Sequence, residues 1–113
     1  MRMRIPPKRI RERFVLTYEL EGCQTAVDLL TKFYGIKRMK IVLDGRRVGK
    51  GDVACYFTNR AYFTKRGLTK RTVLHELYHH LVDVRGHELP NGVEEKNANR
   101  YAREFLKCRY SAH

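Results

Sequence analysis

The sequence predicts a small α+β domain, and three observations lead to that prediction. The chain has 113 residues, 42% of them hydrophobic, which is enough for one core and too little for two. Helical periodicity early in the chain gives way to short β-rich runs in the middle. After Gly67 the helical pattern returns. We therefore expect one domain over residues 1–113, in the order helix, three short strands, helix, helix.

The first half of the chain contains the first helix and the three strands. Residues 1–12 are basic and contain prolines, so we expect a loose lead-in there. From Cys23 onward apolar residues recur at helical spacing, which predicts a helix that stops at Gly35. Asp44 and Gly45 form a tight-turn signal after the first strand. The predicted strands, rich in β-branched and aromatic residues, cover 39–43, 53–58 and 61–64.

The second half contains two predicted helices. Either Thr69 or Thr72 can cap the first of them, which ends at Gly86. A loop follows, and the last helix then runs from Val93 to about Arg109. Two glutamates lie in its first turn, where the helix dipole favours negative charge.

The first of these helices carries an H-E-x-x-H motif, formed by His75, Glu76 and His79. Residues four apart lie on the same face of a helix, so the two imidazoles can bind one metal ion. Glu76 lies one step around the helix, within reach of a water on that ion. This spacing is typical of zinc metallopeptidases, and it predicts a Zn²⁺ site.

A catalytic zinc needs a third protein ligand, and the last helix offers Glu94 and Glu95. Glu95 shares a stripe with Ala98 and Ala102, whose small side chains allow the two helices to approach closely. Glu94 is turned away by about 100°. We therefore expect Glu95 to be the ligand. Asn99, one turn further on, is expected to orient a ligand imidazole through a hydrogen bond.

The predicted chemistry is peptide hydrolysis with Glu76 as general base and acid. The zinc ion activates a water and polarises the scissile carbonyl, and Glu76 carries the proton to the leaving nitrogen. An oxyanion needs a further donor, for which Tyr101, Tyr110 and His87 are candidates. His80 is off the ligand face, and we expect a surface or partly packed histidine.

The charge of the chain supports a second hypothesis. Lys and Arg number 24 against 12 acidic residues, which gives a net charge of +12. Such a surface attracts polyanions, although it can equally serve solubility. Aromatic and basic residues also alternate over residues 56–66, where rings could stack on bases. The alternative function is therefore a basic nucleic-acid-binding module in which the zinc is structural.

The cysteines and hydropathy bear on the compartment. Cys23, Cys55 and Cys108 are far apart and form no C-x-x-C pair, which argues against a disulfide framework and a cysteine zinc site. A reduced, cytoplasmic compartment is expected. No signal peptide and no membrane span are apparent in the sequence. The sequence leaves open whether the protein is a monomer or a dimer.

The motif together with residues 95–102 resembles the gluzincin metallopeptidases, and the size and element order are most similar to the minigluzincins. This resemblance implies a zinc peptidase that acts on a peptide or protein substrate. Residues 59–63 resemble the edge strand with which gluzincins hold substrate, which implies that role for Asn59 and Ala61. Asn99 stands where a thermolysin-like enzyme would have an aspartate.

The resemblance also implies latency. Minigluzincins are similar to zymogens in which a C-terminal segment obstructs the cleft. In this chain the corresponding segment is the tail over residues 109–113, and the adjoining Cys108 or the terminal His113 could occupy the open position of the zinc.

Overall fold

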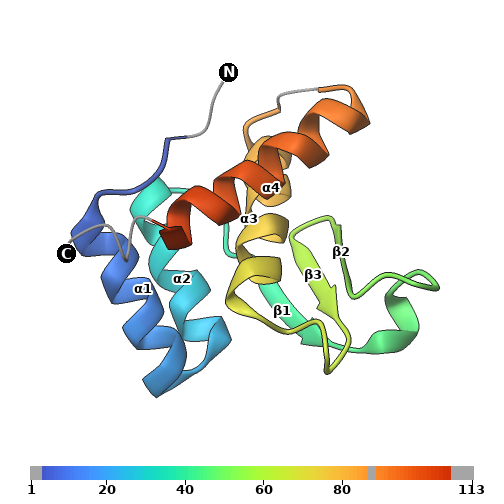
Figure 1. Cartoon of the computed structure of the whole chain (residues 1–113), viewed down its shortest axis with the longest axis horizontal. Helices are drawn as coiled ribbons and strands as arrows, with labels where there is room; N and C mark the ends of the chain where they lie inside the picture. The colour runs from blue at the N-terminus through green and yellow to red at the C-terminus, as the bar shows by residue number, and fades with distance from the viewer. Residues whose placement is uncertain (1–3, 87–88, 108–113) are drawn as a thin grey trace.

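The computed structural model describes residues 4–86 and 89–107. Within these ranges the chain forms four helices and one three-stranded sheet, so the predicted α+β class is confirmed. In Figure 1 helix α3 lies between a pair of helices, α1 and α2, and the sheet, while α4 packs across α3. The helices are α1 (Lys8–Glu21), α2 (Cys23–Tyr34), α3 (Lys70–Val84) and α4 (Asn91–Lys107).

Helix α1 corrects the prediction of a loose lead-in over residues 1–12, because the helix already begins at Lys8. Basic and acidic residues occupy half of its positions, and only Phe14, Val15 and Thr17 are buried. The narrow apolar stripe explains why the sequence pattern did not predict this helix. Helix α2 ends as expected at Gly35, whose φ of 67° is in the left-handed region.

The sheet has the order β1-β3-β2, with strands β1 (Lys40–Leu43), β2 (Ala54–Phe57) and β3 (Arg60–Phe63). Strand β3 is central, parallel to β1 and antiparallel to β2. Thr58 and Asn59, with φ of 39° and 63°, form the two-residue turn between β2 and β3. The turn signal at Asp44 does not make a hairpin. Its side chain instead caps a short 3₁₀ helix, Gly45–Arg47.

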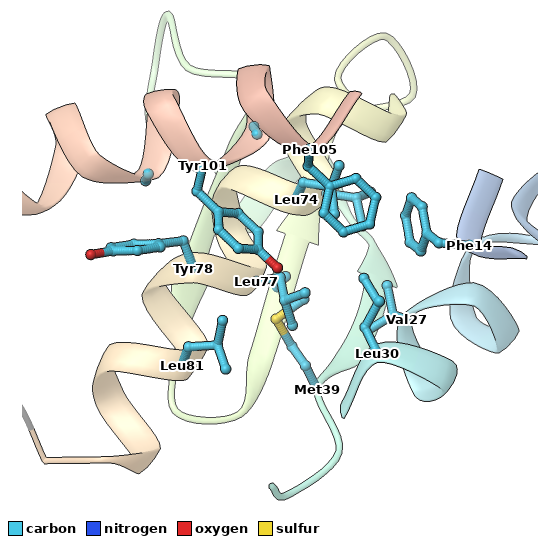
Figure 2. Close-up of a cluster of buried hydrophobic side chains, with 14 of the residues drawn as sticks. Phe14, Val27, Leu30, Met39, Leu74, Leu77, Tyr78, Leu81, Tyr101 and Phe105 are labelled. Atoms are coloured by element: carbon cyan, nitrogen blue, oxygen red, sulfur yellow. The ribbon is translucent and has the colours of Figure 1, made fainter. Parts of the chain in front are cut away.

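Helix α3 begins at the predicted cap, because the Thr69 side chain accepts a hydrogen bond from the backbone of Thr72. Its apolar face enters the core through Leu74, Leu77 and Leu81, which are fully buried. Figure 2 shows these side chains together with Phe14 and Phe105, whose rings pack edge to face with centroids 5.2 Å apart. The opposite face of α3 is left for the functional residues.

No helix in the described part of the chain is long and apolar enough to cross a bilayer. Cys23 and Cys55, the two cysteines within the described ranges, are free.

Candidate metal centre

Helices α3 and α4 together bring His75, His79 and Glu95 to one point, as the spacing predicts. The Nε2 atoms of the two histidines are 3.2 Å apart. Glu95 places one carboxylate oxygen 2.9 Å from His75 Nε2 and the other 3.2 Å from His79 Nε2. One ligand atom from each residue lies within 4.8 Å of the other two, so the three can hold one ion.

The other ring nitrogens are fixed by residues of α4. His75 Nδ1 lies 2.9 Å from Asn99 Oδ1, which is the predicted role of Asn99. His79 Nδ1 donates to the carboxylate of Glu94. Glu94 therefore does not point away from the site, and that expectation is corrected. The His79 ring lies between the two glutamates. Glu94 therefore contacts one ring nitrogen and Glu95 lies near the other, although the two residues are about 100° apart around α4.

The donor set fits a zinc ion. An acceptor faces each Nδ1, so each imidazole carries its proton there and presents a lone pair at Nε2. Two lone pairs and a carboxylate at this separation repel one another unless a cation lies between them. Two nitrogens bound tetrahedrally at 2.0–2.1 Å would be about 3.3 Å apart, close to the 3.2 Å found. Burial also lowers the pKa of His75, although Glu95 opposes this, and so favours the neutral ligand form.

Glu76 lies beside this centre in a dry environment. Its side chain is only 6% exposed. Burial raises its pKa to about 7, against the opposing effect of nearby His79. A carboxyl group with this pKa can both accept and return a proton near neutral pH.

A cleft of about 720 Å³ opens over the four residues. Its floor is the exposed face of α3, and one wall is the start of α4. The other wall is strand β2 with the residues before it, which the sequence analysis did not assign to the site. Additional lining residues are Asp52, Val53, Ala54, Cys55, Tyr56, Arg71 and Thr72. The strand order, which the sequence pattern does not give, decides which strand borders the cleft.

Strand β2 is tied to the metal helix by hydrogen bonds. The Tyr56 hydroxyl donates to Asp83 Oδ2 at 2.6 Å and lies 2.8 Å from His80 Nδ1. His80 Nε2 donates to the Lys37 carbonyl oxygen at 2.6 Å. His80 is fully buried, so the expectation of a surface or partly packed side chain is wrong. Its two ring nitrogens connect α3 to β2 and to the segment after α2.

The structure does not support the substrate-binding role expected for Asn59 and Ala61. Strand β3 is paired on both sides, so its backbone is not free to bind a peptide. Ala61 is fully buried between Ile41 and Tyr56. Asn59 belongs to the turn, where its left-handed backbone conformation is common for asparagine. The edge strand beside the cleft is β2.

Tyr101 is also removed from the list of oxyanion donors. It points into the core from α4 (Figure 2) and is 3% exposed. Its hydroxyl lies 2.7 Å from that of Tyr34. The other residues named for this role or for latency lie outside the described residues, and those predictions stand untested. They are His87, Tyr110, Cys108 and His113.

In comparisons with known proteins, no family model matches the chain, and neither does a curated protein or a solved structure.

Proposed function

We propose that this protein is a zinc-dependent peptidase. The observation that carries the proposal is the convergence of two imidazole lone pairs and one carboxylate beside a buried glutamate, at the base of an open cleft. Bound there, zinc would supply a Lewis acid that activates water and polarises a carbonyl group. Three protein donors and an open side are typical of catalytic zinc, whereas structural zinc is usually closed by four.

Individual residues of the chain would then have separate roles in the reaction. Glu76 would take a proton from the attacking water and return it to the leaving amine. Asn99 and Glu94 would hold the two imidazoles in the tautomer that binds metal. Strand β2 would add an extended peptide along its free edge through backbone hydrogen bonds.

The test compares three proteins after loading with zinc: the unchanged chain, Glu76→Gln and His79→Ala. We expect about one equivalent of bound zinc for the first two and loss of high-affinity binding for His79→Ala. A library of fluorogenic peptides should be cleaved only by the unchanged chain, because loss of a general base typically costs about 10²–10⁴-fold in rate. Asp83→Asn is not a suitable control, because Asp83 accepts a hydrogen bond from Tyr56, which lines the cleft. Glu12→Gln, exposed on α1, controls for the loss of one carboxylate.

Two results would contradict the proposal. One is that the unchanged chain binds no zinc after incubation with an excess of the ion. The other is that Glu76→Gln cleaves peptides as fast as the unchanged chain. The predicted latency is tested separately by deleting residues 109–113, and unchanged peptidase activity would count against it.

A further inference from the structure

The second face of the sheet is built differently from the face that packs on the helices. The inner-facing residues of β2 and β3, among them Tyr56, Ala61 and Phe63, belong to the hydrophobic core or pack against it. Side chains alternate along a strand, so the residues between them point to the other side. We call this side the outer sheet face, and it consists of Lys40, Val42, Cys55, Phe57, Arg60 and Tyr62.

Aromatic and basic side chains share the outer sheet face. Phe57 is 60% exposed, although it is a large apolar residue that a core would normally bury. Tyr62 is paired with Cys55, and Arg60 is paired with Phe57. The two pairs are neighbours on the outer sheet face. Arg47, from the 3₁₀ helix, places its guanidinium 5.9 Å from the centre of the Tyr62 ring. Lys40 pairs with Arg60 from the other side.

These side chains enclose a hollow of about 600 Å³. It is lined by Arg47, Cys55, Phe57, Thr58, Arg60 and Tyr62, none of which is acidic. The nearby Asp44 carboxylate is held by Arg46, with 3.0 Å between Oδ1 and Nε. The hollow therefore combines two ring faces with two guanidinium groups, and its charge is complementary to a polyanion.

We propose that the outer sheet face binds single-stranded nucleic acid. Bases would stack on Phe57 and Tyr62, and Arg47, Arg60 and Lys40 would pair with the phosphates. Exposed rings flanked by cations are the chemistry that binds unpaired bases without regard to sequence. Duplexes keep their bases stacked and offer the rings nothing to bind. An acidic peptide would use the cations and leave the aromatic rings exposed.

This binding is separate from the proposed peptidase chemistry, although the two sites adjoin. Cys55 lines both the hollow and the cleft, because β2 borders the cleft with its edge and the hollow with its outer side. Glu76 lines the cleft and not the hollow. Glu76→Gln should therefore leave nucleic-acid binding unchanged, so failure of one proposal does not imply failure of the other.

The experiment measures fluorescence anisotropy of the full chain with a labelled single-stranded oligonucleotide of mixed sequence, and with the matching duplex. Phe57→Ala should weaken single-strand binding roughly five-fold or more, the effect of losing one stacked base. The double variant Arg47→Ala, Arg60→Ala should lower the salt dependence, with the slope of log K against log salt reduced by about 1.4 for two phosphate contacts.

Matched controls come from helix α1, which lies across the molecule from the sheet (Figure 1). Leu20→Ala removes an apolar side chain that is 74% exposed. Arg9→Ala with Arg13→Ala removes two exposed arginines. We expect neither control to change binding more than about two-fold at fixed salt, as each lacks the stacking surface. Circular dichroism and thermal melts verify that all variants are folded.

Four outcomes of the oligonucleotide measurements would overturn the proposal, and a fifth concerns other polyanions. The four are absence of single-strand binding at low salt, an unaltered affinity in folded Phe57→Ala, equal losses in the α1 arginine variant, and equal affinity for the duplex. Binding of poly-glutamate or phosphatidylserine vesicles that exceeds oligonucleotide binding, and that depends on the same arginines, would assign the face to another polyanion and would also overturn it.

Discussion

The imidazole of His79 lies between two successive carboxylates of α4. Glu94 accepts from Nδ1, and Glu95 approaches Nε2 to 3.2 Å. His75 has Asn99 in the first position and Glu95 in the second. One ring is thus oriented by a charged acceptor and the other by a neutral one. A carboxylate raises the basicity of its histidine more than an amide does, so the two ligands are not equivalent.

Asn99 is the simplest place to test this arrangement. Replacement by alanine removes the acceptor that holds His75 in its metal-binding tautomer. We expect zinc affinity, measured by competition with a chelator, to fall about 10- to 100-fold. Asn97→Ala, on a different side of α4, is the matched control and should bind zinc as the unchanged chain does. Equal affinities for Asn99→Ala and the unchanged chain would contradict the orienting role.

Glu76 makes the stability of the metal-free protein depend on pH. Its pKa is about 7 in the folded protein and about 4.5 when unfolded, so folding favours the protonated form. The stabilisation is complete below pH 4.5 and is lost as the pH rises through 7. In chelator, Glu76→Gln should therefore be more stable than the unchanged chain at pH 8, by up to on the order of 3 kcal/mol.

Urea unfolding at several pH values measures this difference. The two proteins should converge near pH 4, where Glu76 is protonated whether or not the chain is folded. A difference that stays constant from pH 4 to pH 8 would show that burial of the charge is not its cause. Glu12→Gln, exposed on α1, again serves as the control for charge.

The residues of the site could be predicted from their spacing in the sequence. The direction in which Tyr101 points could not. His75, Glu76, His79, Glu95 and Asn99 are related by helical geometry alone, because all five lie on two helices whose faces can be calculated. Tyr101 lies on the same helix as Glu95, and spacing alone does not say whether its ring points into the core or into the cleft. Only the contacts that Tyr101 makes with Tyr78 of α3 and Tyr34 of α2 answer that.

Secondary-structure elements were predictable where their patterns were strong. The three strands and the last two helices agree with their predicted ranges within a few residues, because their apolar periodicity is clear. Helix α1 was missed because its charged residues hide a narrow apolar stripe. The position of β2 at the sheet edge could not be predicted, because it depends on β1 pairing with β3 in parallel across a long connection.

Gly67 lies in the segment that connects this sheet edge to helix α3. A Cβ at this position would lie 2.1 Å from the Val53 carbonyl oxygen, which also accepts from Thr64 at 3.0 Å. Gly67→Ala must displace the residues that enter β2, so we expect a loss of about 2 kcal/mol or more in the free energy of unfolding. Weaker peptide binding should accompany this loss, since Val53 lines the cleft.

Gly92, in the first turn of α4, is the matched control, because a Cβ there meets no atom within 4 Å. Gly92→Ala should stabilise the protein by up to about 1 kcal/mol by restricting the unfolded chain. Denaturant titration compares the two variants. If the two variants changed the free energy of unfolding by similar amounts, the close approach of Gly67 to Val53 would not be the cause.

At the scale of the whole molecule, three partly buried hydroxyl and thiol groups limit stability in alkaline solution. Burial raises the pKa of Tyr18 and of Tyr34 to about 12, and that of Cys23 to about 11. The protonated forms are favoured in the folded protein. Their contribution is therefore complete below about pH 9 and is lost as the pH rises through 11 to 12.

We expect the thermal midpoint to fall by on the order of 5 °C or more between pH 8 and pH 11. Tyr34→Phe, which cannot ionise at that position, should lose less over the same interval, even though it gives up the hydrogen bonds to Tyr101 and to the Arg4 carbonyl. Calorimetry at constant ionic strength measures both. Parallel curves for the two proteins would exclude Tyr34 as a source of the decline.

One wall of the cleft, strand β2, is fixed to the floor, helix α3. The Tyr56 hydroxyl joins β2 to α3 by donating a hydrogen bond to Asp83, and it lies 2.8 Å from His80 Nδ1. His80 extends the connection to the segment after α2. These contacts hold the free edge of β2 in place beside α3. A substrate of the proposed peptidase that pairs with this edge must offer an extended backbone with unpaired N–H and C=O groups, as a terminus or a frayed segment does.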